Sequence, residues 1–243
     1  MYFAIVMAKF PDKRTRVCLF FRTLFRLRYK VTLVNTACLD QPGSKLVWPT
    51  HMAVIDPMLL FSELYNYPLQ PFVDERFFAN RIFRSILSVF DSISVPNLRK
   101  SRNGLEQAKK LNGLCYNALK EGKTVIFYPS GHCTSDGKES MGGRNMAHTI
   151  AQQLPSGTRI IGVKIRGLWG SCTSRYGRKG TPPIFPTMFT NAWKLFFPRR
   201  KVTMEFEDIT DLVLSWQGMD KVEFNHHLEE YYNSKGIDEP KTK

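Results

Sequence analysis

The 243-residue sequence predicts an α/β fold: a mostly parallel sheet with helices on both faces, preceded by a basic amphipathic N-terminal helical arm. Two observations support this class. Short apolar segments typical of buried strands alternate with helical patterns along most of the chain. No internal repeat or low-complexity linker interrupts this alternation. We therefore expect a basic arm at 1–30, one α/β domain at 31–237 and a frayed tail at 238–243.

The predicted strands are apolar runs of the length that β-strands adopt. They lie at 30–35, 45–50, 70–73, 91–95, 123–128, 158–165 and 201–206. Between them, apolar residues recur at helical spacing, which predicts helices at 56–65, 79–89, 103–121, 144–154 and 219–233. Because parallel strands end at the same edge of a sheet, ligands are expected at that edge.

The net charge of +14 requires an anionic partner. The candidates are nucleic acid, an anionic membrane face, and phosphorylated or acidic-carrier substrates. No nucleic-acid-binding signature accompanies the charge, which argues against nucleic acid. The five cysteines show no C-x-x-C spacing, a pattern that predicts a reduced, cytosolic setting and argues against a zinc knuckle.

Positive charge is concentrated in the first 30 residues, which hold eight Lys or Arg residues and one acidic residue, Asp12. Phenylalanine and leucine are interleaved with these cations, as in helices that lie in a membrane interface. No run of 18 apolar residues and no signal-peptide pattern occurs, so we expect peripheral attachment to the cytoplasmic face of the cell membrane. The residues expected to face the membrane are Arg16, Phe20, Phe21, Arg22, Phe25 and Arg26. The alternative is a terminal helix that packs its phenylalanines onto the domain and exposes its arginines to solvent.

A histidine and an aspartate, His51 and Asp56, stand where the second predicted strand turns into a helix. Asp56 followed by Pro57 matches a helix N-cap with proline at the first helical position. A turn between the strand and the helix lets the carboxylate reach the imidazole, and a histidine held in this way is a general base. The alternative is that Asp56 is only a helix cap and His51 only a buried, hydrogen-bonded histidine.

Two further segments follow predicted strands at the same edge of the sheet. Residues 96–102 provide the cations Arg99, Lys100 and Arg102 beside the start of a helix, which favours anions. Residues 128–137 form a turn rich in Gly and Ser, including Ser130 and Gly131, that is suited to close approach of a ligand. With Arg144 as another cation for a phosphate, these residues predict a site for an anionic substrate.

Taken in order, these motifs resemble the glycerophospholipid acyltransferase superfamily, represented by 1-acylglycerol-3-phosphate acyltransferase. Residues 50–57 are similar to the family block Asn-His-x4-Asp-Pro, with Thr50 in place of asparagine. Residues 127–131 resemble the block Phe-Pro-Glu-Gly-Thr-Arg, and 159–165 resemble a later apolar strand. The segments 165–171 and 195–203 are similar to the acyltransferase half of 2-acylglycerophosphoethanolamine acyltransferase.

The resemblance implies an acyltransferase in which His51 is the base and Asp56 its orienting partner. The implied donor is acyl-CoA or acyl-carrier protein, the implied acceptor is the hydroxyl or amine of a lysophospholipid or related single-chain lipid, and no metal or cofactor is implied. Three positions depart from the family: Ser130 replaces glutamate, Cys133 replaces arginine and Gly162 replaces proline. These departures leave a second hypothesis open, in which the chain is a non-catalytic module that binds anionic lipid on the same fold. Retention of both His51 and Asp56 favours the enzyme.

The same departures bear on the acceptor. Ser130 offers only a neutral hydrogen bond and Cys133 is a weak partner. We therefore expect a preference for a lysophospholipid with a substituted headgroup, or for a single-chain aminolipid, over 1-acylglycerol 3-phosphate.

Two other segments have weaker patterns. His226 and His227 with Glu229 and Glu230 are ligand types that metals use, but a solvated face of the last predicted helix accounts for them more simply. The aromatic and basic residues of 193–201 are typical either of an interfacial patch or of core packing.

Overall fold

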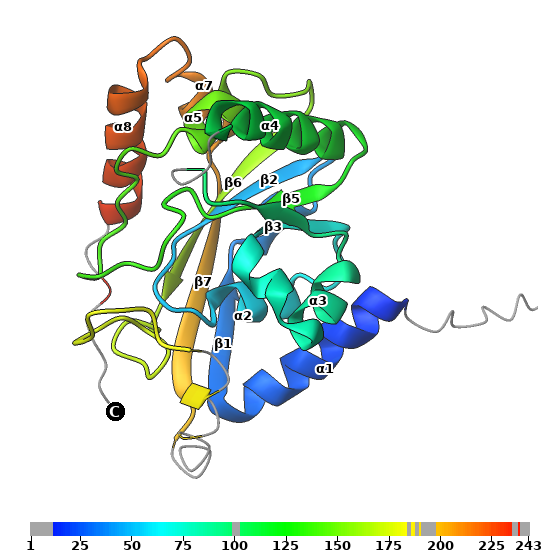
Figure 1. The fold of residues 1–243 in the computed structure, drawn as a ribbon, viewed down its shortest axis with the longest axis vertical. Helices are drawn as coiled ribbons and strands as arrows, with labels where there is room; N and C mark the ends of the chain where they lie inside the picture. The colour runs from blue at the N-terminus through cyan, green and yellow to red at the C-terminus, as the bar shows by residue number, and fades with distance from the viewer. Residues whose placement is uncertain are drawn as a thin grey trace, which may run out of the picture.

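A computed structural model describes residues 12–98, 103–183, 186–187, 190, 198–234 and 238. Within these residues the chain forms a seven-stranded sheet in the order β1-β7-β6-β2-β5-β3-β4 (Figure 1). The strands are β1 (Tyr29–Val34), β2 (Lys45–Pro49), β3 (Leu69–Asp74), β4 (Ile93–Val95), β5 (Thr124–Ile126), β6 (Arg159–Arg166) and β7 (Arg200–Asp208). Neighbouring strands are parallel except β6 and β7, which pair antiparallel.

The sheet is accompanied by α-helices and two 3₁₀ turns. They are α1 (Lys13–Arg28), η1 (Thr36–Leu39), α2 (Asp56–Glu63), η2 (Glu75–Ala79), α3 (Arg81–Ser88), α4 (Gly104–Lys120), α5 (Met146–Ala151), α7 (Thr210–Leu214) and α8 (Lys221–Asn233). The predicted α/β class is confirmed, and each predicted strand and helix has a counterpart. The short helix α7 and the two 3₁₀ turns are too brief to leave a periodic pattern in the sequence.

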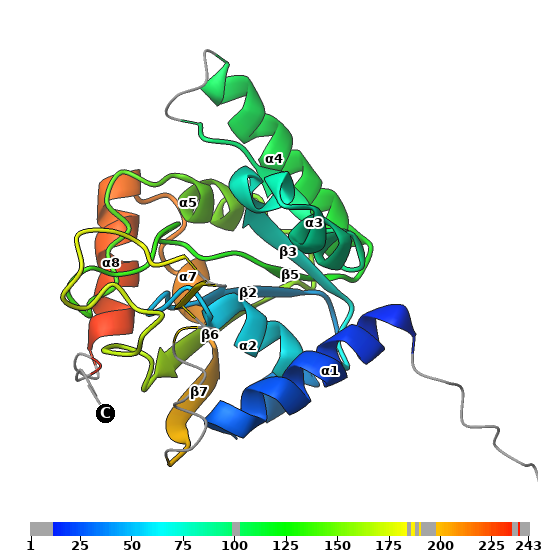
Figure 2. The same ribbon diagram turned by 60° about the horizontal axis from the view of Figure 1, so that its bottom comes forward.

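Side chains of the central strands alternate between the two faces of the sheet. In β2, Val47 packs in the core that includes residues of α1 and α2, whereas Leu46 and Trp48 pack in the core formed with α4, α5, α7 and α8. All three are fully buried. The two groups of helices lie on opposite sides of the sheet in Figure 2. Because β2 is covered on both faces, its sequence is a continuous apolar run rather than an alternating one.

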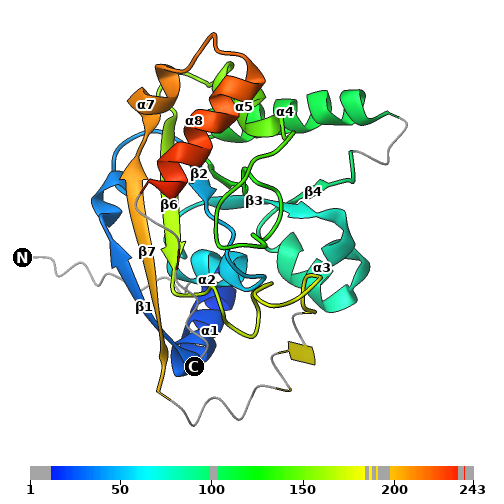
Figure 3. The same ribbon diagram turned by 90° about the vertical axis from the view of Figure 1, so that its left-hand side faces the viewer.

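Helix α1 is an integral part of this core. It lies along α2 (Figure 3), where Arg22 Nε and Arg26 Nε donate to the buried carboxylate of Glu63 at 2.9 and 3.1 Å. Phe25 is only 2 % exposed, so the prediction that it faces a membrane is wrong. Phe21 stacks on Phe25 and packs against the same core. Phe21 and Phe25 therefore pack on the domain rather than on a membrane, because packing beside α2 removes their rings from water.

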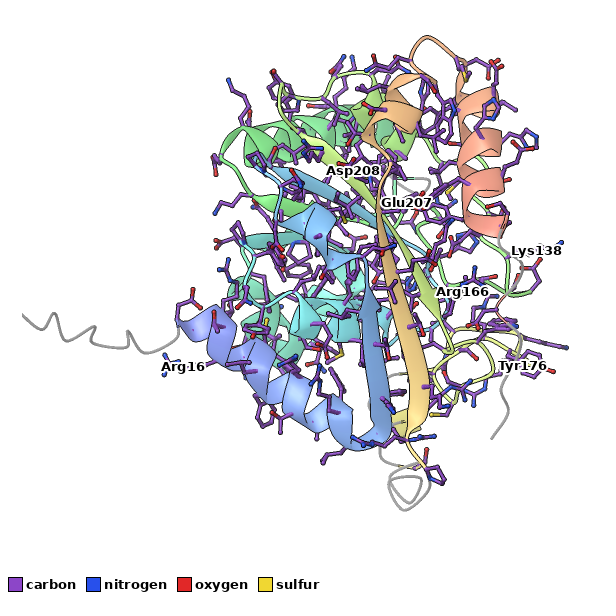
Figure 4. All side chains as sticks on the ribbon, turned by 180° about the vertical axis from the view of Figure 1, so that it is seen from behind. Arg16, Lys138, Arg166, Tyr176, Glu207 and Asp208 are labelled. Atoms are coloured by element: carbon purple, nitrogen blue, oxygen red, sulfur yellow. The ribbon has the colours of Figure 1, made fainter. Side chains whose placement is uncertain are left out.

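The outer face of α1 is exposed. Arg16 extends from it away from the sheet (Figure 4), and Phe20 is 65 % exposed. Leu24 and Leu27 are also exposed, and they follow Phe20 at spacings of four and seven residues, which places all three on one side of the helix. None of the helices among the described residues is long and apolar enough to cross a membrane.

The boundaries of the predicted domains also change. The expected division at residue 30 falls inside β1, whose residues pair in register with β7. Asp238, expected in a frayed tail, is buried instead, and its carboxylate accepts hydrogen bonds from the N–H groups of Gly167 and Trp169. Glu207 and Asp208 are the last two residues of β7 (Figure 4). Asp208 forms an ion pair with Arg159, at 2.7 Å.

Candidate functional site

The site is built on the turn between β2 and α2. Thr50 anchors the start of this turn on β6, because its N–H donates to Val163 O and its hydroxyl accepts from the Ile165 N–H, both at 2.9 Å. Helix α2 begins at Asp56 with Pro57 next, where a missing N–H costs no helical hydrogen bond. The turn therefore connects two fixed ends, the strand and the helix.

The carboxylate of Asp56 is completely buried and organises the turn. Its Oδ2 accepts the N–H groups of Met52 at 2.6 Å and Ala53 at 2.8 Å, and it lies 3.2 Å from Nδ1 of His51. Asp56 is the first helical residue rather than the N-cap, which is Ile55, so the expectation that Asp56 caps the helix is wrong. Its bonds go to groups that precede α2, which means that the carboxylate holds the turn and the imidazole.

The imidazole of His51 is fixed from several sides. Its ring packs on that of Tyr128, with 4.3 Å between centroids, and Sγ of Cys133 lies 3.5 Å from Nε2. The backbone carbonyl of His51 accepts the N–H of Thr134 at 2.8 Å. Since β2 and β5 are neighbouring parallel strands, the segment after β5 runs beside the segment after β2, as the sequence predicted.

A second buried carboxyl group, that of Glu139, completes the turn. Its side chain accepts the N–H of His51. Ser130 is buried, and its hydroxyl is in contact with the carbonyl of His132 at 3.2 Å. Ser130 was predicted to bind substrate, but its hydroxyl is engaged by the protein, where it shapes the turn around His51.

The other residues predicted to bind substrate have different outcomes. Arg99, Lys100 and Arg102 lie outside the described residues. Gly131 adopts the left-handed conformation at φ +61°, and a Cβ there would come within 2.9 Å of Arg144 Nε. Arg144 therefore lies against the same turn as Ser130 and Gly131.

Four residues of the site were given no role from the sequence: Tyr128, Cys133, Glu139 and Arg175. Arg175 donates from Nη1 to the carbonyl of Cys133 at 3.3 Å. It comes from the loop after β6, which is tied to the turn by the bond from Val54 N–H to Thr173 O. The replacement of a family arginine by Cys133 was visible in the sequence, but no spacing pattern connects Glu139 or Arg175 with His51.

The charges around His51 shift the ionisation of several groups. Burial disfavours the imidazolium of His51, but Cys133 and Asp56 outweigh burial and raise its pKa. Burial raises the pKa of Asp56, and the hydrogen bonds from His51 and the two backbone N–H groups oppose that effect. Burial lowers the pKa of His132. The cations of Arg144 and Arg175 act on His132 in the same direction, so both arginines contribute positive potential to the site.

The other candidate ligands are on the surface. His226 and His227 form exposed ion pairs with Glu230 at 3.4 Å on α8. The described part of the chain contains no group of three or more His, Cys, Asp or Glu residues that could hold a metal ion.

Comparison with known proteins connects this arrangement to an enzyme fold. No family model matches the sequence, and no curated protein matches it. Among solved structures, the fold is similar to that of the 1-acyl-sn-glycerophosphate acyltransferase PlsC from Thermotoga maritima, with a TM-score of 0.59 and 16% sequence identity. The similarity covers 91% of this chain and 77% of that chain. The fold implied by the sequence resemblance is therefore confirmed.

Glu139 gives a prediction for stability. Burial raises its pKa from 4.5 to about 7, although the hydrogen bond from the His51 N–H lowers it. Because the folded-state pKa lies above that of the unfolded chain, this group stabilises the fold fully below pH 4.5, and its contribution is lost as the pH rises through about 7. The variant Glu139→Gln keeps an acceptor for the His51 N–H but cannot ionise. Its free energy of unfolding should therefore fall less over this pH range than that of the wild type.

Chemical denaturation at a series of pH values measures the difference. Glu106→Gln is the matched control, because Glu106 is exposed on α4 and its loss should leave the pH dependence unchanged. Equal pH dependence in the wild type and Glu139→Gln would contradict a buried carboxyl with a raised pKa.

Proposed function

We propose that this chain is an acyltransferase that moves a fatty acyl group from acyl-CoA or acyl-carrier protein to a lysophospholipid or related single-chain lipid. His51 is the general base and Asp56 is its orienting partner. The observation that carries the proposal is the contact of 3.2 Å between His51 Nδ1 and the buried Asp56 carboxylate, in a fold similar to that of a known acyltransferase.

The geometry suits proton transfer. A carboxylate beside Nδ1 makes this nitrogen the donor, so Nε2 is the nitrogen that accepts a proton. As the acceptor hydroxyl or amine attacks the acyl carbonyl carbon, Nε2 takes its proton and the carbon–sulfur bond of the thioester breaks. The imidazolium that forms is stabilised by Asp56, which the two backbone N–H groups hold in place.

Positive groups near the turn support an anionic substrate. Arg144 lies against Gly131, and Arg175 reaches the carbonyl of Cys133. Acyl-CoA, the carrier-protein arm and lysophospholipids all contain phosphate, which guanidinium groups bind through paired hydrogen bonds. The predicted contacts of Arg99, Lys100 and Arg102 would add to this potential.

A lipid acceptor also requires access to a membrane surface, and α1 supplies one. The exposed Phe20, Leu24 and Leu27 form an apolar strip, and the end of α1 adjoins the start of β7 through a bond from Arg28 to Pro198 O at 3.3 Å. Four cations also gather at this end: Arg26, Lys30, Arg199 and Lys201. Apolar side chains bordered by cations are typical of a surface that binds anionic lipid headgroups. We place this surface on the cytoplasmic face of the cell membrane.

The non-catalytic alternative uses the same surface but not the site. Lipid binding alone would not require a buried carboxylate aligned with a histidine. The contact between Asp56 and His51 therefore favours the enzyme.

The first functional prediction concerns the base. His51→Ala should abolish nearly all acyl transfer, because it removes the nitrogen that takes the proton of the acceptor. Asp56→Asn should lower kcat by about 10³- to 10⁴-fold, because the wrong histidine tautomer becomes favoured, as it does in the serine-protease triad. Transfer of a labelled acyl group to lysophospholipid by purified protein measures both effects. Near-normal turnover of a folded His51→Ala protein would reject the assignment.

The second prediction concerns the membrane surface. Replacing Phe20, Leu24 and Leu27 together by serine should lower binding to anionic vesicles by at least about tenfold, because each lost side chain contributes roughly 1.5–3 kcal/mol when fully buried. Deleting the arm would be a poorer test, since it removes Phe25 from the core. Co-sedimentation with vesicles provides the measurement.

The matched control carries serine at Leu105 and Val222, which are exposed on α4 and α8. It should bind vesicles like the wild type. Equal binding by all three proteins would show that the lipid surface lies elsewhere, and unchanged binding at high salt would contradict the role of the cations.

The third prediction concerns the acceptor. Ser130 and Cys133 stand where the family has glutamate and arginine, and the Ser130 hydroxyl is bonded to the His132 carbonyl. We therefore expect that 1-acylglycerol 3-phosphate is not the preferred acceptor. A lysophospholipid with a substituted headgroup or a single-chain aminolipid should have the higher kcat/KM. Competition between these acceptors at equal concentration measures the ratio. A clear preference for 1-acylglycerol 3-phosphate would refute the inference.

A further inference from the structure

The position of Cys133 beside the base is the feature that the direct transfer described above does not use. Its Sγ lies 3.5 Å from Nε2 and 3.7 Å from Nδ1 of His51, and Asp56 contacts Nδ1. The side chain is 5 % exposed and packs beside Val54. The neighbouring Thr134 N–H is bonded to the His51 carbonyl, which fixes the two segments in register.

We propose that Cys133 is a catalytic nucleophile, which takes the acyl group from the donor as a thioester before the group passes to the acceptor. This inference rests on the proposed acyl transfer at His51. A thiol is activated when it contacts a histidine that in turn contacts an aspartate. The carboxylate orients the imidazole, and the imidazole takes the thiol proton.

The two steps balance. In the first, the Cys133 proton moves to Nε2, the thiolate attacks the donor carbonyl carbon, the bond to the donor sulfur breaks, and the departing thiolate takes the proton from His51. In the second, His51 removes the proton of the acceptor hydroxyl or amine, which attacks the acyl-Cys133 carbonyl carbon. The carbon–sulfur bond to Cys133 then breaks, leaving the thiolate beside the imidazolium. No further reactant is needed, and the exchange of one thioester for another costs little free energy.

Two polar atoms without a partner belong to residues that contact His51 and Cys133. The Tyr128 hydroxyl and Nε of Arg175 are both buried and have no hydrogen-bond partner among the described residues. The Tyr128 ring packs on His51, and the other end of the Arg175 guanidinium donates to the carbonyl of Cys133. Unused donors beside a nucleophile are suited to the negative oxygen that forms when a thioester carbonyl is attacked.

Three of the other cysteines, Cys18, Cys38 and Cys115, lack such surroundings. Cys18 and Cys115 are buried in the core, where burial raises the pKa of Cys18 to about 11 and that of Cys115 to about 12. The thiol of Cys38 is in contact with the carbonyl of Asn35 on η1 at 3.1 Å. Cys38 is half-buried and distant in sequence from the site, which makes it the matched control for Cys133.

The test begins with the wild-type protein and palmitoyl-CoA or palmitoyl-carrier protein, without any acceptor. After an acid quench, intact mass should show one added acyl group, peptide mapping should place it on Cys133, and neutral hydroxylamine should remove it. Addition of lysophospholipid before the quench should discharge the acyl group into lipid product. His51→Ala should not acquire the acyl group, which separates catalysed acylation from spontaneous reaction with the donor.

Variants complete the test. Cys133→Ala should lower acyl transfer by at least about 100-fold, whereas Cys38→Ala should transfer at the wild-type rate. Cys133→Ser preserves the size of the side chain and should form, slowly, an oxygen ester that resists neutral hydroxylamine. Thermal unfolding of each variant checks that the fold is retained.

Each outcome distinguishes the two proposals. If His51→Ala is inactive while Cys133→Ala transfers normally and no acyl group is found on Cys133, the covalent step is overturned and the general-base function stands. If the wild type neither transfers an acyl group nor acquires one from either donor, the proposed function itself fails.

Discussion

The arrangement of the site depends on one buried charge. Asp56 has no exposed surface, and a carboxylate removed from water is stable only if its neighbours replace the lost hydrogen bonds. Here Oδ2 meets the N–H groups of Met52 and Ala53 and the imidazole of His51. Because Oδ1 has no hydrogen-bond partner among the described residues, a shift in any of these groups would remove part of the compensation that Oδ2 receives. The need to satisfy this carboxylate therefore fixes the direction of the imidazole.

The sheet supplies the rest of the geometry. Because β2 pairs with both β5 and β6, three segments leave the sheet side by side at one edge. They bring His51, Cys133 and Arg175 together from positions that are far apart in the sequence. Thr50 ties the turn to β6, so the base is held by rigid elements on both sides. Such pre-organisation is what proton transfer at a fixed distance requires.

The parts predicted well from the sequence are those with local signals. Apolar periodicity located the strands and the longer helices, and the spacing of His51 and Asp56 identified a pair joined by one turn. Glu139 and Arg175 reach the site only through the order of strands in the sheet, which local patterns do not encode. The arm shows a second limit: apolar residues occur on both faces of α1, so composition could not show that Phe25 is buried and Leu24 exposed. Asp238 was missed because its partners lie on a loop some 70 residues earlier.

The most direct measurement of the central claim is the nitrogen NMR titration of the His51 ring in the folded protein. With Asp56 on Nδ1, that nitrogen should keep its proton throughout, and Nε2 should be the nitrogen that loses its proton as the pH rises. The pKa of Nε2 should lie above that of an ordinary histidine, because Asp56 and Cys133 outweigh burial. Loss of the proton from Nδ1, or a His51 pKa below the ordinary value, would contradict the role assigned to Asp56.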